Sequence, residues 1–189
     1  MTYKTTEDLQ NLSIVNKHDS GKKDENEIAK KTIQDENEET KRHQKYLKMA
    51  VVTSLRSKDP CTQVGCVIVD ENDQIVSIGY NGFPIGIDDD VFRWDKEDPE
   101  DNKHLYVVHA EMNAIINKRR DTLHGCTVYV TLFPCNKCAQ MLIQSRVKKV
   151  IYIEDRDCLP FRISKRMLDY VNIPYEQCSL PTEKLILEM

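Results

Sequence analysis

Residues suited to binding a metal ion occur in two short segments of the chain. Cys135 and Cys138 stand three positions apart in PCNKC, and His109 opens the segment HAE. Thiolate and imidazole are donors that zinc accepts, and a spacing of three places both cysteines on one side of a helical turn. At a helix start, the backbone N–H groups and the helix dipole favour the thiolate form that a metal requires. We therefore expect one Zn²⁺ ion held by His109, Cys135 and Cys138.

A carboxylate, Glu111, lies two residues after His109. In the first turn of a helix this side chain can point past the metal ligand, towards an open position on the ion. Zinc lowers the pKa of a bound water to about 7, and a nearby carboxylate can take the water's proton and return it to a substrate. We predict that Glu111 is the catalytic residue and that the fourth position on zinc belongs to water.

The alternative is a structural zinc site with four protein ligands. Its fourth ligand would be another cysteine or histidine, and the candidates are His104, His124, Cys126 and Cys158. Structural sites usually contain two close pairs of ligands, and this chain offers one such pair, Cys135 and Cys138. The spacing therefore favours a catalytic zinc.

Hydrophobic periodicity predicts the elements that position these residues. Strands are expected at 64–70, 74–81, 125–132, 148–155 and 174–178. Helices are expected at 44–58, 108–120, 135–145 and 163–171. The first two strands form a hairpin, and a long connection rich in Gly, Pro and Asp follows at 82–104. Strands that alternate with helices imply parallel pairing, so we predict an α/β protein with three layers (α/β/α) and a mixed five-stranded sheet.

Residues 1–42 differ in composition from the rest of the chain. They are rich in Lys, Glu, Asp, Asn and Gln and cannot bury enough apolar surface to offset chain entropy. We expect a disordered or loosely docked arm, in which one apolar patch could dock, formed by Leu9, Leu12, Ile14 and Val15. The zinc-dependent domain is predicted at 43–180, followed by a tail at 181–189.

Composition also argues against several classes of protein. The 189 residues carry a formal net charge of −4, whereas general binding of nucleic acid needs a basic surface. No apolar run reaches the ~20 residues that span a bilayer, and no signal pattern opens the chain, so we expect a cytoplasmic protein with no membrane partner. The cysteine count of seven is odd, which favours metal binding or buried thiols over a disulfide framework.

Together, HAE and PCNKC match the H-x-E … P-C-x-x-C signature of zinc nucleobase deaminases. The chain resembles the deoxycytidylate (dCMP) deaminase family, within the cytidine deaminase-like superfamily. The resemblance runs from about Lys45 to about Val171 and rests on SKDPCTQVGCVIV, IGYNGFPIGIDDDVFRW, VVHAEMNAIINK, GCTVYVTLFPCNKCAQMLIQS and VKKVIYIED. The zinc motif is common to the superfamily, whereas the GYNGFPIG…DD…W loop points to the dCMP branch.

The resemblance implies a cytidine deaminase-like fold and hydrolytic deamination of dCMP to dUMP and ammonia, which supplies dUMP for thymidylate synthesis. It also implies that His109, Cys135 and Cys138 hold the zinc and that Glu111 carries the proton. The substrate contacts that it implies are at Asn81, Ala110, Thr131 and Pro134.

The phosphate of a nucleotide requires cations or N–H donors. Ser57 and Lys58 end the first predicted helix and are candidates for this contact, together with Arg56. Arg156 is another candidate, because it follows the fourth predicted strand, at the edge of the sheet where α/β folds tend to bind ligands.

The resemblance further implies regulation and assembly. Proteins of the family are commonly activated by dCTP and inhibited by dTTP, and they form homo-oligomers (dimer, trimer or hexamer). Mg²⁺ would accompany a triphosphate effector. Effector contacts are expected in the glycine-rich loop, at Gly79, Tyr80, Gly82 and Gly86, because glycine lets a backbone approach a triphosphate closely.

Other functions stay open at this point. A deaminase of dCTP or CMP would differ only in the phosphates or sugar that it accommodates. A tRNA adenosine deaminase shares the zinc motif, but the acidic composition and the GYNGFPIG loop disfavour it. A nucleoside cytidine deaminase typically has cysteine as its first zinc ligand, where this chain has His109. A catalytically inactive regulatory homologue that binds nucleotides would have no need of Glu111.

Overall fold

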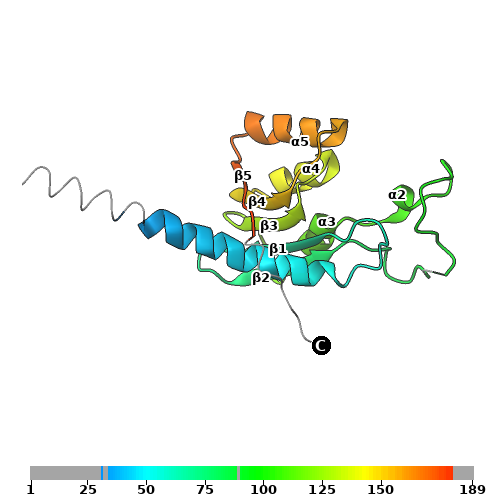
Figure 1. The fold of residues 1–189 in the computed structure, drawn as a ribbon, viewed down its shortest axis with the longest axis horizontal. Coiled ribbons are helices and arrows are strands. Elements are labelled where there is room, and N and C mark those ends of the chain that lie inside the picture. Colours follow the sequence, from blue (N-terminus) through cyan, green and yellow to red (C-terminus); the bar gives the residue numbers. More distant parts are fainter. Residues whose placement is uncertain (1–30, 32–33, 89, 181–189) are drawn as a thin grey trace, which may run out of the picture. The chain divides into compact units, whose positions relative to one another are not determined.

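A five-stranded mixed sheet organises the chain (Figure 1). The computed structural model describes residues 31, 34–88 and 90–180. The strands are β1 (Gly65–Val69), β2 (Ile75–Tyr80), β3 (Thr127–Leu132), β4 (Lys149–Glu154) and β5 (Tyr175–Gln177). They lie in the order β2-β1-β3-β4-β5; β1 is antiparallel to β2 and β3, and β4 is parallel to β3 and β5. The predicted α/β fold with a mixed five-stranded sheet is confirmed.

The connections between strands explain these directions. A tight turn joins β1 to β2, and in it the Asp70 side chain accepts hydrogen bonds from the backbone of Asn72 and Gln74. One helix separates β3 from β4 and another separates β4 from β5, and such crossovers make neighbouring strands parallel. The helices that follow β2 are α2 (Lys103–Tyr106), α3 (Ala110–Ile116), α4 (Asn136–Gln144) and α5 (Leu159–Tyr170).

Two helices differ from expectation. Residues 34–54 form one helix, which therefore begins well before residue 44, where apolar periodicity starts. Its first part is exposed and is held by local contacts, among them an ion pair of 3.0 Å between Lys41 and Glu38. The short helix α2 was not expected, since four residues within a polar connection give no periodic signal.

The predicted apolar patch at 9–15, most of the predicted arm and the tail at 181–189 lie outside the described residues.

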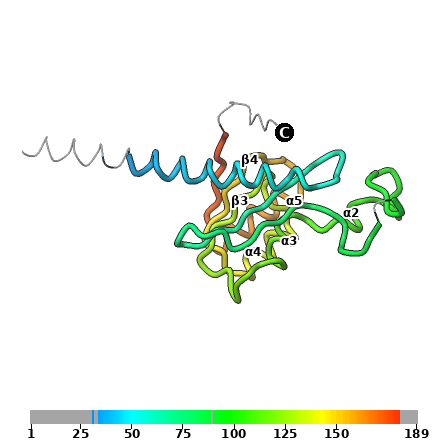
Figure 2. The backbone as a smooth tube through the Cα atoms, turned by 90° about the horizontal axis from the view of Figure 1, so that it is seen from below, coloured from blue at the N-terminus to red at the C-terminus, as the bar shows by residue number. Residues whose placement is uncertain are grey.

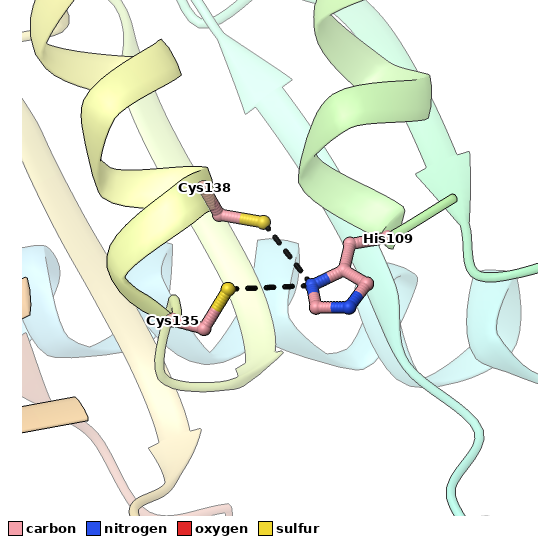
Figure 3. Close-up of side chains that lie close together, drawn as sticks. All are labelled: His109, Cys135 and Cys138. Atoms are coloured by element: carbon pink, nitrogen blue, oxygen red, sulfur yellow. Dashed lines mark hydrogen bonds between the residues drawn. The ribbon is translucent and has the colours of Figure 1, made fainter. Parts of the chain in front are cut away.

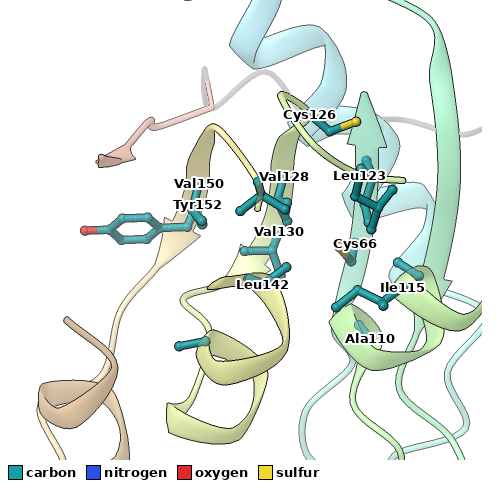
Figure 4. Packing of buried hydrophobic residues seen from close by; sticks show 14 of the residues in the cluster. Cys66, Ala110, Ile115, Leu123, Cys126, Val128, Val130, Leu142, Val150 and Tyr152 are labelled. Atoms are coloured by element: carbon teal, nitrogen blue, oxygen red, sulfur yellow. The ribbon is translucent and has the colours of Figure 1, made fainter. Parts of the chain in front are cut away.

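Alternate residues of the strands face two different layers of helix. Cys66 and Ile68 pack in a cluster with residues of α3, α4 and α5 (Figure 4). Val67 and Val69 point the other way and pack against Tyr46, Leu47 and Ala50. Figure 2 shows residues 43–54 (cyan) on one side of the strands and α3 and α4 on the other. The predicted three layers are thus present.

Gly65 lets the first helix lie close to β1. A Cβ atom on this residue would fall 2.0 Å from the backbone oxygen of Ala50 and 2.6 Å from the backbone nitrogen of Ser54. Any other residue would push the helix away from the sheet.

In the part of the chain that the structure describes, no helix has the length and apolar character needed to cross a membrane.

Candidate active site

The starts of α3 and α4 bring three potential metal ligands together (Figure 3). His109 is the N-cap of α3, Cys135 is the N-cap of α4, and Cys138 lies in the first turn of α4. Nδ1 of His109 is 3.4 Å from Sγ of Cys135 and 3.4 Å from Sγ of Cys138. Tetrahedral zinc with ligand bonds of about 2.0–2.3 Å has neighbouring donors roughly 3.6 Å apart. The number, chemistry and spacing of these donors fit one zinc ion.

Backbone contacts on either side hold both helix starts. Gly82 and Val108 exchange two hydrogen bonds, of 3.1 and 2.9 Å, immediately before His109. On the other side, the backbone N–H of Phe133 donates to the carbonyl of Glu154 at 2.8 Å, which extends the pairing of β3 and β4 almost to Cys135. An isolated backbone bridge therefore holds the start of α3, and an extension of the β3–β4 pairing holds the start of α4.

The local electrostatics favour a cation at this point. Hydrogen bonds with Cys138 and His109 together lower the pKa of the Cys135 thiol to about 4, against the effect of burial. The same contact with Cys135, together with burial, raises the pKa of Cys138 well above its ordinary value. The lowered pKa of Cys135 favours the thiolate form, which is the form that binds a metal ion.

Glu111 is buried beside this cluster, with 3% of its surface exposed. Burial raises the pKa of its carboxyl group, and the charge of His109 acts in the opposite direction. A carboxyl group whose pKa is raised accepts a proton more readily at neutral pH than an exposed glutamate does. This property suits a residue that takes up a proton and releases it again.

His109, Glu111 and Cys135 line a cavity of about 330 Å³, and we call these residues its metal end. Ala110, a predicted substrate contact, lines it as well. We call the polar and charged residues of the same lining its polar end, namely Asp59, Thr62, Asn81, Lys96, Lys103, His104 and Arg156. A metal end and a polar end in one cavity suit a substrate with a heterocyclic base and a charged tail.

Asn81 is held rigidly in this cavity. Its side-chain oxygen accepts the backbone N–H of Val64 at 2.8 Å, and its amide nitrogen donates to the carbonyl of Thr62 at 3.0 Å and to Asp59 at 3.3 Å. These contacts fix the orientation of the amide. The predicted residues Asn81, Ala110 and Arg156 thus all lie in the same cavity as Glu111.

Four predicted substrate residues are not part of the described lining. Among the residues that the structure describes, the cavity lining does not include Ser57, Lys58, Thr131 or Pro134. The hydroxyl of Ser57 is buried and accepts the backbone N–H of Asp59, whereas Lys58 is exposed. The hydroxyl of Thr131 accepts the backbone N–H of Gly65 at 3.2 Å and so joins β3 to β1. These side chains have structural contacts that position in the sequence does not reveal.

The sequence reasoning missed a buried ion pair in the cavity. Nζ of Lys103 lies 2.6 Å from each carboxylate oxygen of Asp59. Asp59 stands in the segment SKDPC and Lys103 in the long connection, so no local motif joins them. The one available signal was an Asp before Pro, which favours the turn in which Asp59 accepts the backbone N–H groups of Cys61 and Thr62.

Three of the four expected effector residues border a second cavity, of about 770 Å³, beside β2 and α3. Gly79, Tyr80 and Gly82 line it, together with Arg56, whose guanidinium lies 4.7 Å from the centre of the Tyr80 ring. Gly86 is not part of this lining as the structure describes it, and it is exposed with φ +90. Gly79 has a packing role as well, because a Cβ there would lie 2.2 Å from the backbone oxygen of Ala110 in α3.

Comparison with known proteins defines the class. Residues 40–154 match the family described as "Cytidine and deoxycytidylate deaminase zinc-binding region". The chain belongs to this family of zinc-binding deaminases, as the sequence motifs predicted.

Within this family, the chain is similar to proteins that are named deoxycytidylate deaminases. The chain is 72% identical over 164 residues to the probable deoxycytidylate deaminase of Caenorhabditis elegans, covering 87% of this chain and 83% of the relative. It is 48% identical over 113 residues to the deoxycytidylate deaminase of Homo sapiens, covering 59% and 64%. Its fold is similar to that of dCMP deaminase from the cyanophage S-TIM5 in complex with dCMP and dUMP. That match has a TM-score of 0.57 and 28% identity, and it covers 70% of this chain and 93% of the other.

Proposed function

We propose that the protein deaminates dCMP hydrolytically to dUMP with release of ammonia. The observation that carries this proposal is the position of buried Glu111 beside the His109, Cys135 and Cys138 cluster, in a cavity that polar and charged residues also line. Relatives that are named deoxycytidylate deaminases, and the similar phage enzyme with dCMP and dUMP, support dCMP as the substrate. The product dUMP would serve thymidylate synthesis.

His109, Cys135 and Cys138 would hold zinc through one imidazole nitrogen and two thiolates. A zinc ion held there would lower the pKa of a water molecule towards about 7 and so supply a nucleophile for C4 of the cytosine ring. A carboxylate oxygen of Glu111 would take one proton from this water and deliver it to N3 of the pyrimidine, and would then pass the water's second proton to the exocyclic amino group. The water oxygen would stay on C4 as the carbonyl oxygen, and the amino group would leave as ammonia.

The remaining lining positions the nucleotide. Ala110 and Phe133 border the metal end and exclude water from the base. The fixed amide oxygen of Asn81 keeps one lone pair as an acceptor for the nucleotide, and Arg156 supplies a charge for the phosphate at the polar end. Arg156 is the best placed of the predicted phosphate contacts, since Ser57 and Lys58 lie outside the described lining.

A substrate panel tests this function. Ammonia release is measured with dCMP, CMP, dCTP, deoxycytidine and a tRNA anticodon stem, using zinc-loaded protein. We expect turnover to be fastest with dCMP. Absence of dCMP turnover alongside clear turnover of another member would contradict the proposal and identify the alternative.

We also propose a regulatory site for dCTP and dTTP in the second cavity, with Mg²⁺ bound to the triphosphate. Arg56 and Arg119 line that cavity, which supports an anionic ligand. A homo-oligomer is proposed with it. The test measures dCMP turnover with dCTP or dTTP, with and without Mg²⁺, and the mass of the assembly by light scattering. Unchanged turnover would exclude regulation by these nucleotides.

The catalytic domain is proposed to be residues 43–180, in a cytoplasmic protein. All seven cysteines lie in the described part of the chain and none forms a disulfide there, which suits a reducing compartment. Deletion of residues 1–40 should leave zinc content and basal dCMP turnover unchanged. Loss of soluble protein on truncation would show instead that the arm contributes to the fold.

A further inference from the structure

A buried ion pair lies in the cavity that the proposed reaction uses. Nζ of Lys103 is 2.6 Å from both carboxylate oxygens of Asp59, and each side chain is 4% exposed. Both residues line the cavity together with Glu111. Charged groups are rarely buried so completely without a function or a structural requirement.

Asp59 organises the polar end of the cavity. Its carboxylate accepts the backbone N–H groups of Cys61 at 2.8 Å and Thr62 at 3.1 Å, and the amide of Asn81 at 3.3 Å. The hydroxyl of Thr62 in turn accepts a hydrogen bond of 3.3 Å from Arg156. Asp59 thus holds a chain of contacts that ends at the proposed phosphate contact.

Because Asp59 anchors these residues, its negatively charged carboxylate lies in the cavity that would bind the anionic nucleotide. Burial alone would raise the pKa of Asp59, but hydrogen bonds from Lys103 and from the backbone of Cys61 and Thr62 outweigh it, so the pKa is lowered. Asp59 is therefore ionised at neutral pH. An unpaired carboxylate in a partly desolvated cavity would repel a nucleotide phosphate much more strongly than it would in bulk water.

We propose that Lys103 is a positioning residue for the nucleotide: it neutralises Asp59, which can then anchor Thr62 and Asn81 without repelling the phosphate. Both Asp59 oxygens contact the Lys103 ammonium group, so Lys103 acts through Asp59 and need not touch the substrate itself. This inference rests on the proposed function, because it assumes an anionic nucleotide in this cavity.

The two partners should then respond unequally to substitution. Lys103→Met removes the cation and leaves Asp59 with the backbone N–H donors of Cys61 and Thr62, which favour its ionised form. Asp59→Asn keeps an acceptor for the backbone and leaves a positive charge that attracts phosphate. If the pair only stabilised the fold, either change would weaken neutral and anionic ligands alike.

The experiment compares four zinc-loaded proteins: wild type, Lys103→Met, Asp59→Asn and the double variant. Zinc content is measured first, and dUMP and deoxyuridine are then tested as competitors of dCMP turnover. In Lys103→Met we expect dUMP to bind roughly tenfold or more weakly, and deoxyuridine to change by less than about threefold. The double variant, which has no charge at either position, should return dUMP binding to within about threefold of wild type.

Two results would overturn the inference. One is equal weakening of dUMP and deoxyuridine in Lys103→Met, and the other is a double variant that binds dUMP as poorly as Lys103→Met. If Lys103→Met does not fold, the comparison between Asp59→Asn and the double variant tests the inference, because these two proteins differ only at position 103. Asp59→Asn should then bind dUMP more tightly than the double variant does, and equal binding by the two would refute the role of Lys103. Wild-type protein that fails to turn over dCMP would contradict the proposed function itself.

Discussion

The metal end of the cavity takes its ligands from two helix starts, whereas the polar end is assembled from separate segments. His109 and Glu111 are two residues apart, and Cys135 and Cys138 are three apart. At the polar end, Asp59 and Lys103 are 44 positions apart and meet only in the folded chain. A sequence motif can therefore identify the metal ligands and the proton carrier, because they lie close to one another in the chain. It cannot identify a contact such as that between Asp59 and Lys103, whose residues are far apart in the chain.

The two ends should therefore fail in different ways. Changes at the metal end should remove the ion or the chemical step. Changes at the polar end should weaken nucleotide binding and leave the chemical step nearly intact. The following predictions test this contrast, starting with the largest expected effect.

Loss of a metal ligand should have the largest effect. Cys138→Ala removes a thiolate from the cluster, so zinc content and dCMP turnover should both fall below detection, since three protein ligands are the usual minimum for a catalytic zinc. Metal analysis and ammonia release measure the two outcomes. Cys61→Ser is the matched control, because Cys61 is exposed and is not among the described lining residues. A Cys138→Ala protein that retained zinc and activity would show that Cys138 is not a ligand.

Glu111→Gln should separate the metal from the chemistry. The amide preserves the shape of the side chain but cannot carry a proton, so zinc should stay bound while kcat falls by roughly 10²–10⁴-fold. The comparison requires zinc analysis and kcat for the same preparations. Glu71→Gln, at an exposed position in the β1–β2 turn, should match wild type. A rate near wild type in Glu111→Gln would refute the assignment of the proton carrier.

A change at the polar end should instead appear in KM. Arg156→Gln removes a charge from the cavity, so KM for dCMP should rise roughly 10–100-fold, the loss expected for a hydrogen bond to a charged group. Because the phosphate is bound equally before and during reaction, kcat should change little. Arg162→Gln is the control, since Arg162 is exposed, pairs with Asp157 and is outside the described lining. A fall in kcat with KM unchanged would place Arg156 in the chemical step.

The same contrast explains what could be predicted from the sequence. The order of elements followed from periodicity, and the ligand cluster followed from spacing, because both depend on neighbours in the chain. The polar end could not be predicted in this way. Ser57 and Lys58 are close in sequence to Asp59, yet they are not in the described lining of the cavity. Lys103 contacts Asp59 from the start of α2, a helix that the sequence did not predict. Gly79 shows a related limit, since its sequence context suggested an effector contact and its packing against α3 gives it a structural reason as well.

The ionised state of Asp59 can be tested by the pH dependence of the free energy of unfolding, where the effect on dCMP turnover should be the smallest of these four. The lowered pKa of Asp59 means that its ionised form stabilises the folded state above the unfolded pKa of about 3.9. This contribution is lost as the pH falls below about 4 and through the folded pKa. Asp59→Asn has no such titration, so it should be less stable than wild type at pH 7, by roughly 3–5 kcal/mol for a broken buried pair, and the difference should narrow below pH 4. Urea unfolding from pH 7 to pH 2 measures it. A difference that stayed constant with pH would mean that Asp59 is not stabilised as a carboxylate, and the polar end would then have to be held together by its backbone contacts alone.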